Sequence, residues 1–324
     1  MTQKIGILTS GGDCPGLNAC IRAVVRTALA HHLEVIGFRH GYEGLMKGEA
    51  VRLGSSSVSG VINRGGTFLR TARSEKFETS AGIQKASRTL ARMKLKGLIV
   101  IGGNGSLQGA WELSKKTRTA IVGIPKSIDN DVGGTDFTIG FDTAVNTAVE
   151  VIDRIRDTAT SHDRLFLVET MGRNRGFLAL ATALAGGAEG VLLPEIETDL
   201  DHLSQKLEKG KKRGKSSSII VVAEGDTAGG AFKIAAKLRK KLKNYDMKVS
   251  VIGHQQRGGA PSAFDRILAS QFGAAAVEAL LRGEQNTMTA IRRSEIVTVP
   301  LDFSWKIKKP LDASLLRLAE ILSR

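Results

Sequence analysis

Near its start the chain reads KIGILTSGGDCPGLN (residues 4–18). A short run of mostly apolar residues is followed by a turn with adjacent glycines and then by a helical pattern. This order predicts a buried strand, a loop and a helix, the repeating unit of open α/β sheets. Adjacent glycines let the backbone approach a phosphate, and the helix N-terminus offers free N–H groups. The loop matches neither G-x-x-x-x-G-K-[ST] nor G-x-G-x-x-G, so it predicts phosphate binding only in general, and a tight turn without a ligand is the alternative.

The same order of strand, loop and helix recurs along the chain. The predicted strands are mostly continuous apolar runs, which is typical of strands buried on both faces of a parallel sheet. They cover residues 4–8, 34–38, 97–101, 120–123, 164–169, 190–193, 218–223 and 248–253. The predicted helices cover residues 18–30, 83–93, 142–158, 199–209, 231–242 and 264–281. We therefore expect an α/β fold with doubly wound, mainly parallel sheets.

The length of 324 residues suggests about two domains. No linker marks a boundary, but one α/β series gives way to another near Gly140, and we expect the segment after His254 to return to the first. Residues 39–80 break the pattern, because they are rich in glycine and serine and lack long helical periods. A loop-like region of that length in a compact domain is usually functional.

Composition restricts the class of protein. The chain has 47 Lys and Arg against 32 Asp and Glu, a net charge of +15 that favours anionic partners. Residues 206–248 hold 13 of the basic side chains, which we interpret as the wet faces of two amphipathic helices. A nucleic-acid-binding protein is an alternative, but aromatic residues are only 5% and the sequence has no helix-turn-helix, zinc or RNP pattern.

Cysteine usage and hydropathy bear on location. Cys14 and Cys20 form neither a disulfide framework nor a metal set, so we expect free thiols in a reducing compartment, the cytoplasm. The N-terminus has no signal-peptide pattern. The longest apolar stretch, residues 177–185, is too short to span a membrane.

Further loops after predicted strands carry unusual residues. Residues 102–106 read GGNGS, a second glycine loop before a helix, and residues 125–131 read PKSIDND. Two acids at i and i+2 fit a general base and an oxygen ligand for Mg²⁺, with a polar Asx-type turn as the alternative. Arginines also lie in or beside loops with small residues: Arg73, Arg164, Arg173 and Arg257. Because arginine suits phosphate oxygens, the set predicts an enzyme that transfers phosphoryl groups between small molecules.

These residues resemble the bacterial-type 6-phosphofructokinase family almost end to end. The matching stretches are residues 11–18, 62–67, 128–131, 134–136, 171–173, 253–254, 257–259 and 265–270. The resemblance implies transfer of the γ-phosphoryl group of ATP to the 1-hydroxyl of fructose 6-phosphate in glycolysis, with Mg²⁺ as cofactor. It implies an active site in the cleft between two domains and a homotetramer. The nucleotide domain would comprise residues 1–140 and about 256–306, and the fructose 6-phosphate domain residues 141–255 and about 307–324.

The resemblance also implies residue roles. Asp129 would be the general base, with Asp131 beside it near the metal, and Asn104 stands where the family has a Mg²⁺-associated aspartate. Transfer would be assisted by residues around the phosphoryl group: Arg73, Arg173 and Ser127. ATP would be held by Gly12, Tyr42, Arg73, Gly103, Asn104, Gly105 and Ser106, with Tyr42 against adenine. Fructose 6-phosphate would be held by Ser127, Asp129, Met171, Gly172, Arg173, Glu224, His254 and Arg257, and across a subunit interface by Arg164 and Lys248.

An effector pocket is partly matched in this chain. The matching residues are Arg22, Arg26, Arg156, Glu189, Arg213 and Lys215. Ser55 and Ser56 replace the usual arginine and aromatic residue, so we expect altered or weakened regulation by nucleoside diphosphate and phosphoenolpyruvate.

Three departures from the family pattern leave alternatives open. Asn104 lacks the aspartate's charge, which suggests a weakly active regulatory subunit as one alternative. Lys248 replaces an arginine and loses its bidentate geometry. Lys126 is typical of pyrophosphate-dependent members, whereas Gly105 is typical of ATP-dependent ones, and Gly105 and Tyr42 lead us to expect ATP.

Overall fold

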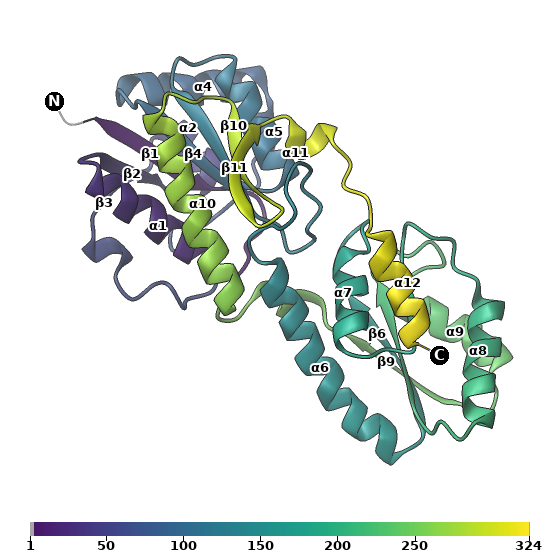
Figure 1. The fold of residues 1–324 in the computed structure, drawn as a ribbon. Coiled ribbons are helices and arrows are strands. Elements are labelled where there is room, and N and C mark those ends of the chain that lie inside the picture. The colour runs from purple at the N-terminus through teal and green to yellow at the C-terminus, as the bar shows by residue number, and fades with distance from the viewer. Residues whose placement is uncertain (1–2, 324) are drawn as a thin grey trace. The chain divides into compact units, whose positions relative to one another are not determined.

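The computed structural model describes residues 3–323 (Figure 1). The chain forms two compact units, one of Met1–Thr143 with Arg257–Lys309 and one of Ala144–Gln256 with Pro310–Arg324. From the sequence we expected divisions at about residues 140, 255 and 306. The ends of the expected domains at residues 1, 2 and 324 lie outside the described residues.

The first unit is built on a seven-stranded sheet with the order β11-β10-β5-β4-β1-β2-β3. Its strands are β1 (Lys4–Thr9), β2 (Glu34–Phe38), β3 (Ala50–Leu53), β4 (Gly97–Gly102), β5 (Ala120–Pro125), β10 (Thr287–Arg292) and β11 (Glu295–Pro300). The five inner strands are parallel, and β3 and β11 pair antiparallel at the two edges. Strand β4, which is buried along its whole length, shows why continuous apolar runs belong at the centre of such a sheet.

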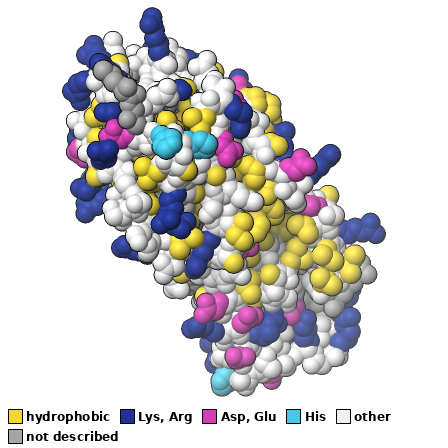
Figure 2. All heavy atoms as spheres, turned by 60° about the vertical axis from the view of Figure 1, so that its left-hand side comes forward, with side chains coloured by type: hydrophobic (Ala, Val, Ile, Leu, Met, Phe, Trp, Pro, Cys, Tyr) yellow, Lys and Arg dark blue, Asp and Glu magenta, His cyan; other side chains and the backbone are white. Residues whose placement is uncertain are grey.

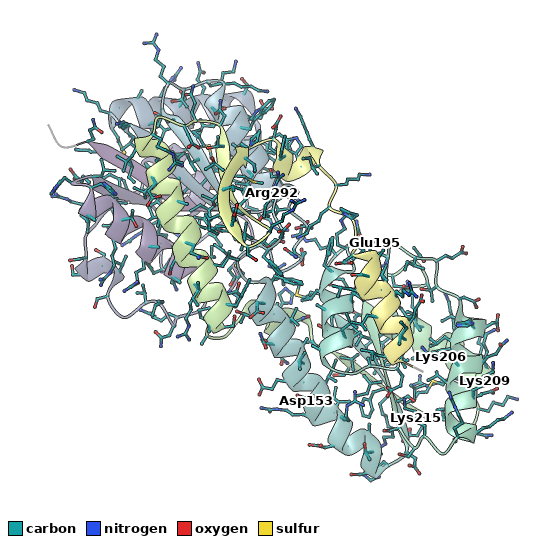
Figure 3. All side chains as sticks on the ribbon, in the orientation of Figure 1. Asp153, Glu195, Lys206, Lys209, Lys215 and Arg292 are labelled. Atoms are coloured by element: carbon teal, nitrogen blue, oxygen red, sulfur yellow. The ribbon has the colours of Figure 1, made fainter. Side chains whose placement is uncertain are left out.

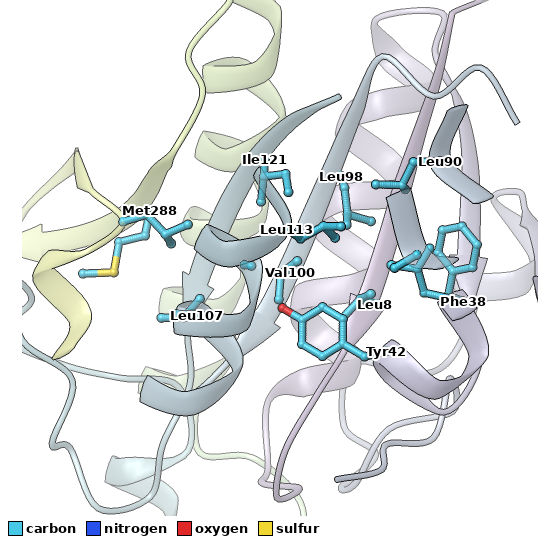
Figure 4. Packing of buried hydrophobic residues seen from close by; sticks show 14 of the residues in the cluster. Leu8, Phe38, Tyr42, Leu90, Leu98, Val100, Leu107, Leu113, Ile121 and Met288 are labelled. Atoms are coloured by element: carbon cyan, nitrogen blue, oxygen red, sulfur yellow. The ribbon is translucent and has the colours of Figure 1, made fainter. Parts of the chain in front are cut away.

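Helices cover both faces of this sheet. The helices of the first unit are α1 (Leu17–Ala30), α2 (Gly41–Lys47), α3 (Glu75–Glu78), α4 (Ser80–Arg92), α5 (Asn104–Ser114), α10 (Ala263–Leu281) and α11 (Phe303–Lys306). Helices α1 and α10 lie side by side (Figure 1), and a Cβ at Gly273 would come within 2.7 Å of the Cβ of Ala23. Leu8, Phe38 and Val100 pack with α2, α4 and α5 in one core cluster (Figure 4).

The second unit is a smaller α/β layer. Its sheet has the order β7-β8-β6-β9, and all its strands pair in parallel. The strands are β6 (Arg164–Thr170), β7 (Gly190–Leu192), β8 (Ser218–Ala223) and β9 (Asp246–Val251). The helices are α6 (Phe141–Ser161, which begins within the first unit), α7 (Phe177–Ala185), α8 (Leu200–Lys212), α9 (Ala231–Lys241) and α12 (Ala313–Leu322). One core cluster joins the sheet to α6, α7 and α12, and another joins it to α8 and α9.

The α/β class with two mainly parallel sheets is therefore confirmed, and several elements were not predicted. The missed elements are β3, β10, β11, α2, α3, α7, α11 and α12. Residues 39–80, expected as a loop, hold α2, β3, α3, the start of α4 and a 3₁₀ turn at Ser56–Val58, but no helix or strand occurs from residue 59 to 74.

The basic stretch at 206–248 covers the end of α8, strand β8, helix α9 and the start of β9. Helices α8 and α9 bury Leu203, Leu207 and Ile234 and expose lysines, as expected of amphipathic helices. On the face seen in Figure 2, Lys and Arg side chains are scattered among acidic and neutral groups. Within residues 3–323, no helix combines the length and the hydrophobicity needed to cross a bilayer.

Candidate active site

Two glycine loops meet at the carboxyl ends of the central strands of the first sheet, the sheet edge at which the site is built. One follows β1 and leads into α1, and the other follows the adjacent strand β4 and leads into α5. The Ser10 amide donates to the Ile101 carbonyl at 3.0 Å, and the Ser106 hydroxyl donates to the Ser10 hydroxyl at 3.0 Å. Neither α1 nor α5 has a side-chain cap at its N-terminus. The first N–H groups of a helix have no helical partner, and here no side chain caps them, which favours an anion at this edge.

An arginine lies over the first loop. A Cβ at Gly12 would meet Nη1 of Arg257 at 2.8 Å, so the glycine leaves room for this guanidinium. Nη1 also donates to the Asp13 carbonyl at 3.2 Å. Arg257, assigned to the sugar phosphate by resemblance, is thus placed beside the predicted phosphate loop within the first unit.

The acidic loop after β5 forms a connected network with the second glycine loop. The Ser127 hydroxyl donates to Oδ1 of Asp131 at 2.8 Å, and Nδ2 of Asn104 donates to Oδ2 of Asp131 at 3.1 Å. Asp129 is only 5% exposed, and its amide donates to the Ser127 hydroxyl at 3.2 Å. Among the described residues, Oδ1 of Asn104 is buried and accepts no hydrogen bond. An uncommitted amide oxygen suits a hard cation or a bound water.

Lys126 lies beneath the first loop. Its Nζ would be 3.6 Å from a Cβ at Gly11, and the residue is 5% exposed. Burial lowers the pKa of Lys126, although Cys14 and Asp129 nearby oppose that shift.

Tyr42 supports the second glycine loop. Its hydroxyl donates to the Ser106 carbonyl at 2.6 Å, and its ring stacks on Phe77 with centroids 3.7 Å apart. The residue is 4% exposed among core side chains (Figure 4), and burial raises the pKa of its hydroxyl, which keeps it neutral. One ring face is therefore occupied by Phe77, which sequence reasoning missed. Contact of Tyr42 with adenine stays a prediction.

Arg73 lies in the segment without helix or strand that precedes α3, and its side chain is exposed. The Thr71 hydroxyl donates to the Gly11 carbonyl at 2.8 Å, which ties this segment to the first loop. Asn18 donates to the carbonyls of Arg64 and Gly65 at 3.0 and 3.1 Å. These bonds hold Arg73's segment against the loops at this sheet edge.

In the second unit, the loops after β6 and β8 meet. The Arg173 amide donates to Oε1 of Glu224 at 2.7 Å, and the Met171 amide donates to Oε1 of Gln256 at 2.8 Å. Met171 and Gly172 are buried, whereas Arg173 is exposed. The structure thus brings together four of the residues assigned to sugar binding and adds Gln256. His254 is exposed in the 3₁₀ turn Gly253–Arg257.

Arg164 and Lys248 share one carboxylate. The register of β6 and β9 pairs Arg164 with Asp246. Asp246 binds Lys248 Nζ at 2.8 Å and Arg164 Nε at 2.8 Å. The pKa of Asp246 is lowered, most strongly by its hydrogen bond with Lys248 and next by its hydrogen bond with Arg164. Sequence reasoning missed Asp246, which holds the two predicted phosphate-binding cations side by side.

The predicted effector residues fall into two groups. Glu189, nearly buried, lies 3.0 Å from Lys215 Nζ and 3.8 Å from Arg156 Nη1. Together with Arg213 and Lys215 it lines a cavity of about 270 Å³. Arg22 and Arg26 lie on α1 in the first unit.

Comparison with known proteins gives a consistent result. A family model described as phosphofructokinase matches residues 4–280. The chain is 49% identical to "ATP-dependent 6-phosphofructokinase" of Halothermothrix orenii over 99% of each chain. It is 51% identical to "ATP-dependent 6-phosphofructokinase 1" of Thermus thermophilus over 99% of each.

Solved structures are similar as well. The phosphofructokinase of Saccharomyces cerevisiae aligns with a TM-score of 0.88 and 34% identity, covering 99% of this chain and 48% of that one. A pyrophosphate-dependent phosphofructokinase from Marinobacter aquaeolei aligns with a TM-score of 0.85, covering 96% of this chain and 86% of that one. Its 23% identity supports the fold alone.

Proposed function

The chain belongs to the phosphofructokinase family, and on that premise we propose that it is an ATP-dependent 6-phosphofructokinase. It transfers the γ-phosphoryl group of ATP to the 1-hydroxyl of fructose 6-phosphate, a step of glycolysis. The observation that carries this proposal is the meeting of the loops after β1, β4 and β5 at one sheet edge, joined by the Ser106–Ser10 and Asn104–Asp131 hydrogen bonds. A buried carboxylate beside two uncapped helices supplies a base and an anion site together.

We assign the chemistry of the acceptor to the acidic loop. Asp129 takes the proton of the sugar hydroxyl. Its burial and the bond from its backbone amide to the Ser127 hydroxyl fix its position in the loop. Arg73 and Arg173 stabilise charge on the transferring group, and Ser127 contacts it. The phosphates of ATP lie on the glycine loops, at Gly12 and at residues 103–106, with Tyr42 supporting them through the Ser106 carbonyl.

Mg²⁺ is part of this proposal. Within residues 3–323, no group of three or more His, Cys, Asp and Glu could hold a metal ion. Mg²⁺ commonly uses one or two carboxylates together with substrate phosphates. The Asp131 carboxylate would supply one, with the uncommitted Oδ1 of the neighbouring Asn104 as a further oxygen. When bound, it neutralises charge on the phosphate oxygens.

The sugar phosphate is assigned to the second unit. The residues that the resemblance assigns to the sugar, Met171, Gly172, Glu224, His254 and Arg257, would hold it. Arg164 and Lys248 would bind the 6-phosphate of a neighbouring subunit's substrate, in a homotetramer. The Glu189 cluster with Arg22 and Arg26 would form an effector site. A cytoplasmic location is supported by the free thiols of Cys14 and Cys20.

The test is aldolase-coupled turnover of fructose 6-phosphate with Mg²⁺, comparing ATP, ADP and pyrophosphate at equal concentration. We expect turnover with ATP alone. Turnover with pyrophosphate alone would refute ATP as donor and make Lys126 the informative residue. If none of the three donors supports turnover, the result would favour the weakly active regulatory subunit that Asn104 suggests.

A further inference from the structure

The last helix of the second unit buries none of its described residues. Helix α12 carries Leu315, Leu318, Ile321 and Leu322, which are 40–67% exposed. Its inner residues Leu316 and Ala319 are only half-buried against the core that contains α7. Since protein interiors are packed to crystal-like density, inner residues of a helix that stay half-buried indicate open space beneath it.

That space is a cavity of about 750 Å³ between α12, the end of α7, β7 and α8. Its apolar wall includes Leu184, Ala188, Val191, Leu193 and Leu316. Ligand pockets in proteins usually measure about 300–1,000 Å³ and combine an apolar lining with a few polar groups. The size and lining of this cavity fall in that class.

One end of the cavity is basic. Lys206, Lys209 and Arg213 line it, and their spacing of three and four residues places them on one side of the end of α8. Lys206 donates to the Ser323 hydroxyl at the end of α12 at 2.5 Å. Figure 3 labels Lys206 and Lys209 in this region of the second unit.

Acidic residues also line the cavity, and two of them lie at its other end. Asp199 accepts hydrogen bonds from the amides of Asp201 and His202 and so caps α8, and Glu197 precedes it. Asp199 and Lys209 are ten residues apart, about 15 Å along the helix. The third acid is Glu320 on α12.

We propose that this cavity binds an organic carboxylate with an extended apolar body. The apolar body packs among Leu184, Val191 and Leu316, and the carboxylate lies at the end lined by Lys209 and Arg213. The smaller cavity at Glu189 and Lys215 is a different space, although Lys206, Arg213 and Ser323 border both. A ligand here would therefore be positioned to influence that neighbouring cluster.

The test is isothermal titration of the full chain with straight-chain carboxylates from butanoate to dodecanoate, all below their micellar concentrations. We expect one saturable site per chain, with affinity rising about fourfold for each added methylene until the cavity is full. Binding only above the micellar concentration, or affinity independent of chain length, would overturn the proposal.

Variants locate the site. Ala319→Trp and, independently, Ala188→Met place extra volume in the cavity, and each should weaken decanoate binding at least tenfold while kinase turnover reports an intact fold. Lys209→Gln should weaken the binding of decanoate several-fold and leave the binding of the uncharged alcohol 1-decanol unchanged. The matched control is Lys243→Gln, an exposed lysine of the same unit outside the cavity. If Lys209→Gln and Lys243→Gln bind decanoate equally well, or if Ala319→Trp and Ala188→Met both bind it as the wild type does, the ligand lies elsewhere and the assignment is refuted.

Discussion

Substituting Asn104 by aspartate tests the network at the start of α5. The amide Nδ2 lies 3.1 Å from Oδ2 of Asp131, and aspartate would put a carboxylate oxygen in its place. Two negative charges at that distance repel by at most about 5 kcal/mol at an effective dielectric constant of about 20. Rearrangement and solvent reduce this figure, but one hydrogen bond of about 1 kcal/mol is lost as well. We expect Asn104→Asp to lower the free energy of unfolding by about 2–4 kcal/mol without divalent cation.

A cation at this place should reverse the effect. With Mg²⁺ and ATP present, the added carboxylate can bind the cation, so the stability loss should shrink and kcat should rise. Denaturant unfolding with and without Mg²⁺, together with coupled turnover across Mg²⁺ concentrations, measures both. Gln108→Glu is the matched control, because it adds the same charge one turn later at an exposed position. An Asn104→Asp variant whose stability and kcat respond to Mg²⁺ no more than this control does would refute the metal assignment.

Three further predictions test the rest of the site. Asp129→Asn should lower kcat by about 10²–10⁴-fold with little change in the KM values, and a loss below tenfold in coupled turnover would contradict its role as base. Gly105→Ala should raise the midpoint of urea unfolding, because alanine is favoured by up to about 1 kcal/mol in helices, while it raises the KM for ATP; an unchanged KM would remove the glycine from the nucleotide site. Lys248 and Arg164 depress the pKa of Asp246, so its stabilising effect exists above the unfolded-state pKa of about 4 and is lost as pH falls through the lower folded pKa. The Tm difference between wild type and Asp246→Asn should therefore vanish in strong acid, and a difference that persists there would contradict the pairing.

The central strands of both sheets were predictable because their residues are apolar without interruption. Elements at the edges of the sheets could not be predicted in this way. The hairpin of β10 and β11 turns at Arg293 and Ser294, both with positive φ (49° and 68°). Asn-Gly or Asp-Gly usually marks such a two-residue turn, so this one carries no sequence signal. Helix α7 was also missed, because residues that are apolar on every side give no helical period.

Residues of the candidate site could be proposed from the sequence where a loop directly follows a strand, as with Asp129 and Asn104. Asp246 was not, because its partnership with Arg164 depends on β6 and β9 being neighbours in register. The order of strands in a sheet is a tertiary property, set by how helices pack on its faces. Phe77 was missed for the same reason, since nothing in its own surroundings indicates that it stacks on Tyr42.

The glycines of the two loops differ in what requires them. Gly16 has a φ of 103°, and a Cβ there would lie 2.5 Å from Cγ2 of Ile139, so folding alone demands glycine. Gly105 has no such φ, and a Cβ there would meet nothing within 4 Å. Glycine costs up to about 1 kcal/mol relative to alanine in a helix, and Gly105 is the second residue of α5, so folding gives no reason for glycine at this position. Space kept open at an uncapped helix N-terminus is best explained by a ligand that approaches the backbone, as the nucleotide of the proposed reaction would.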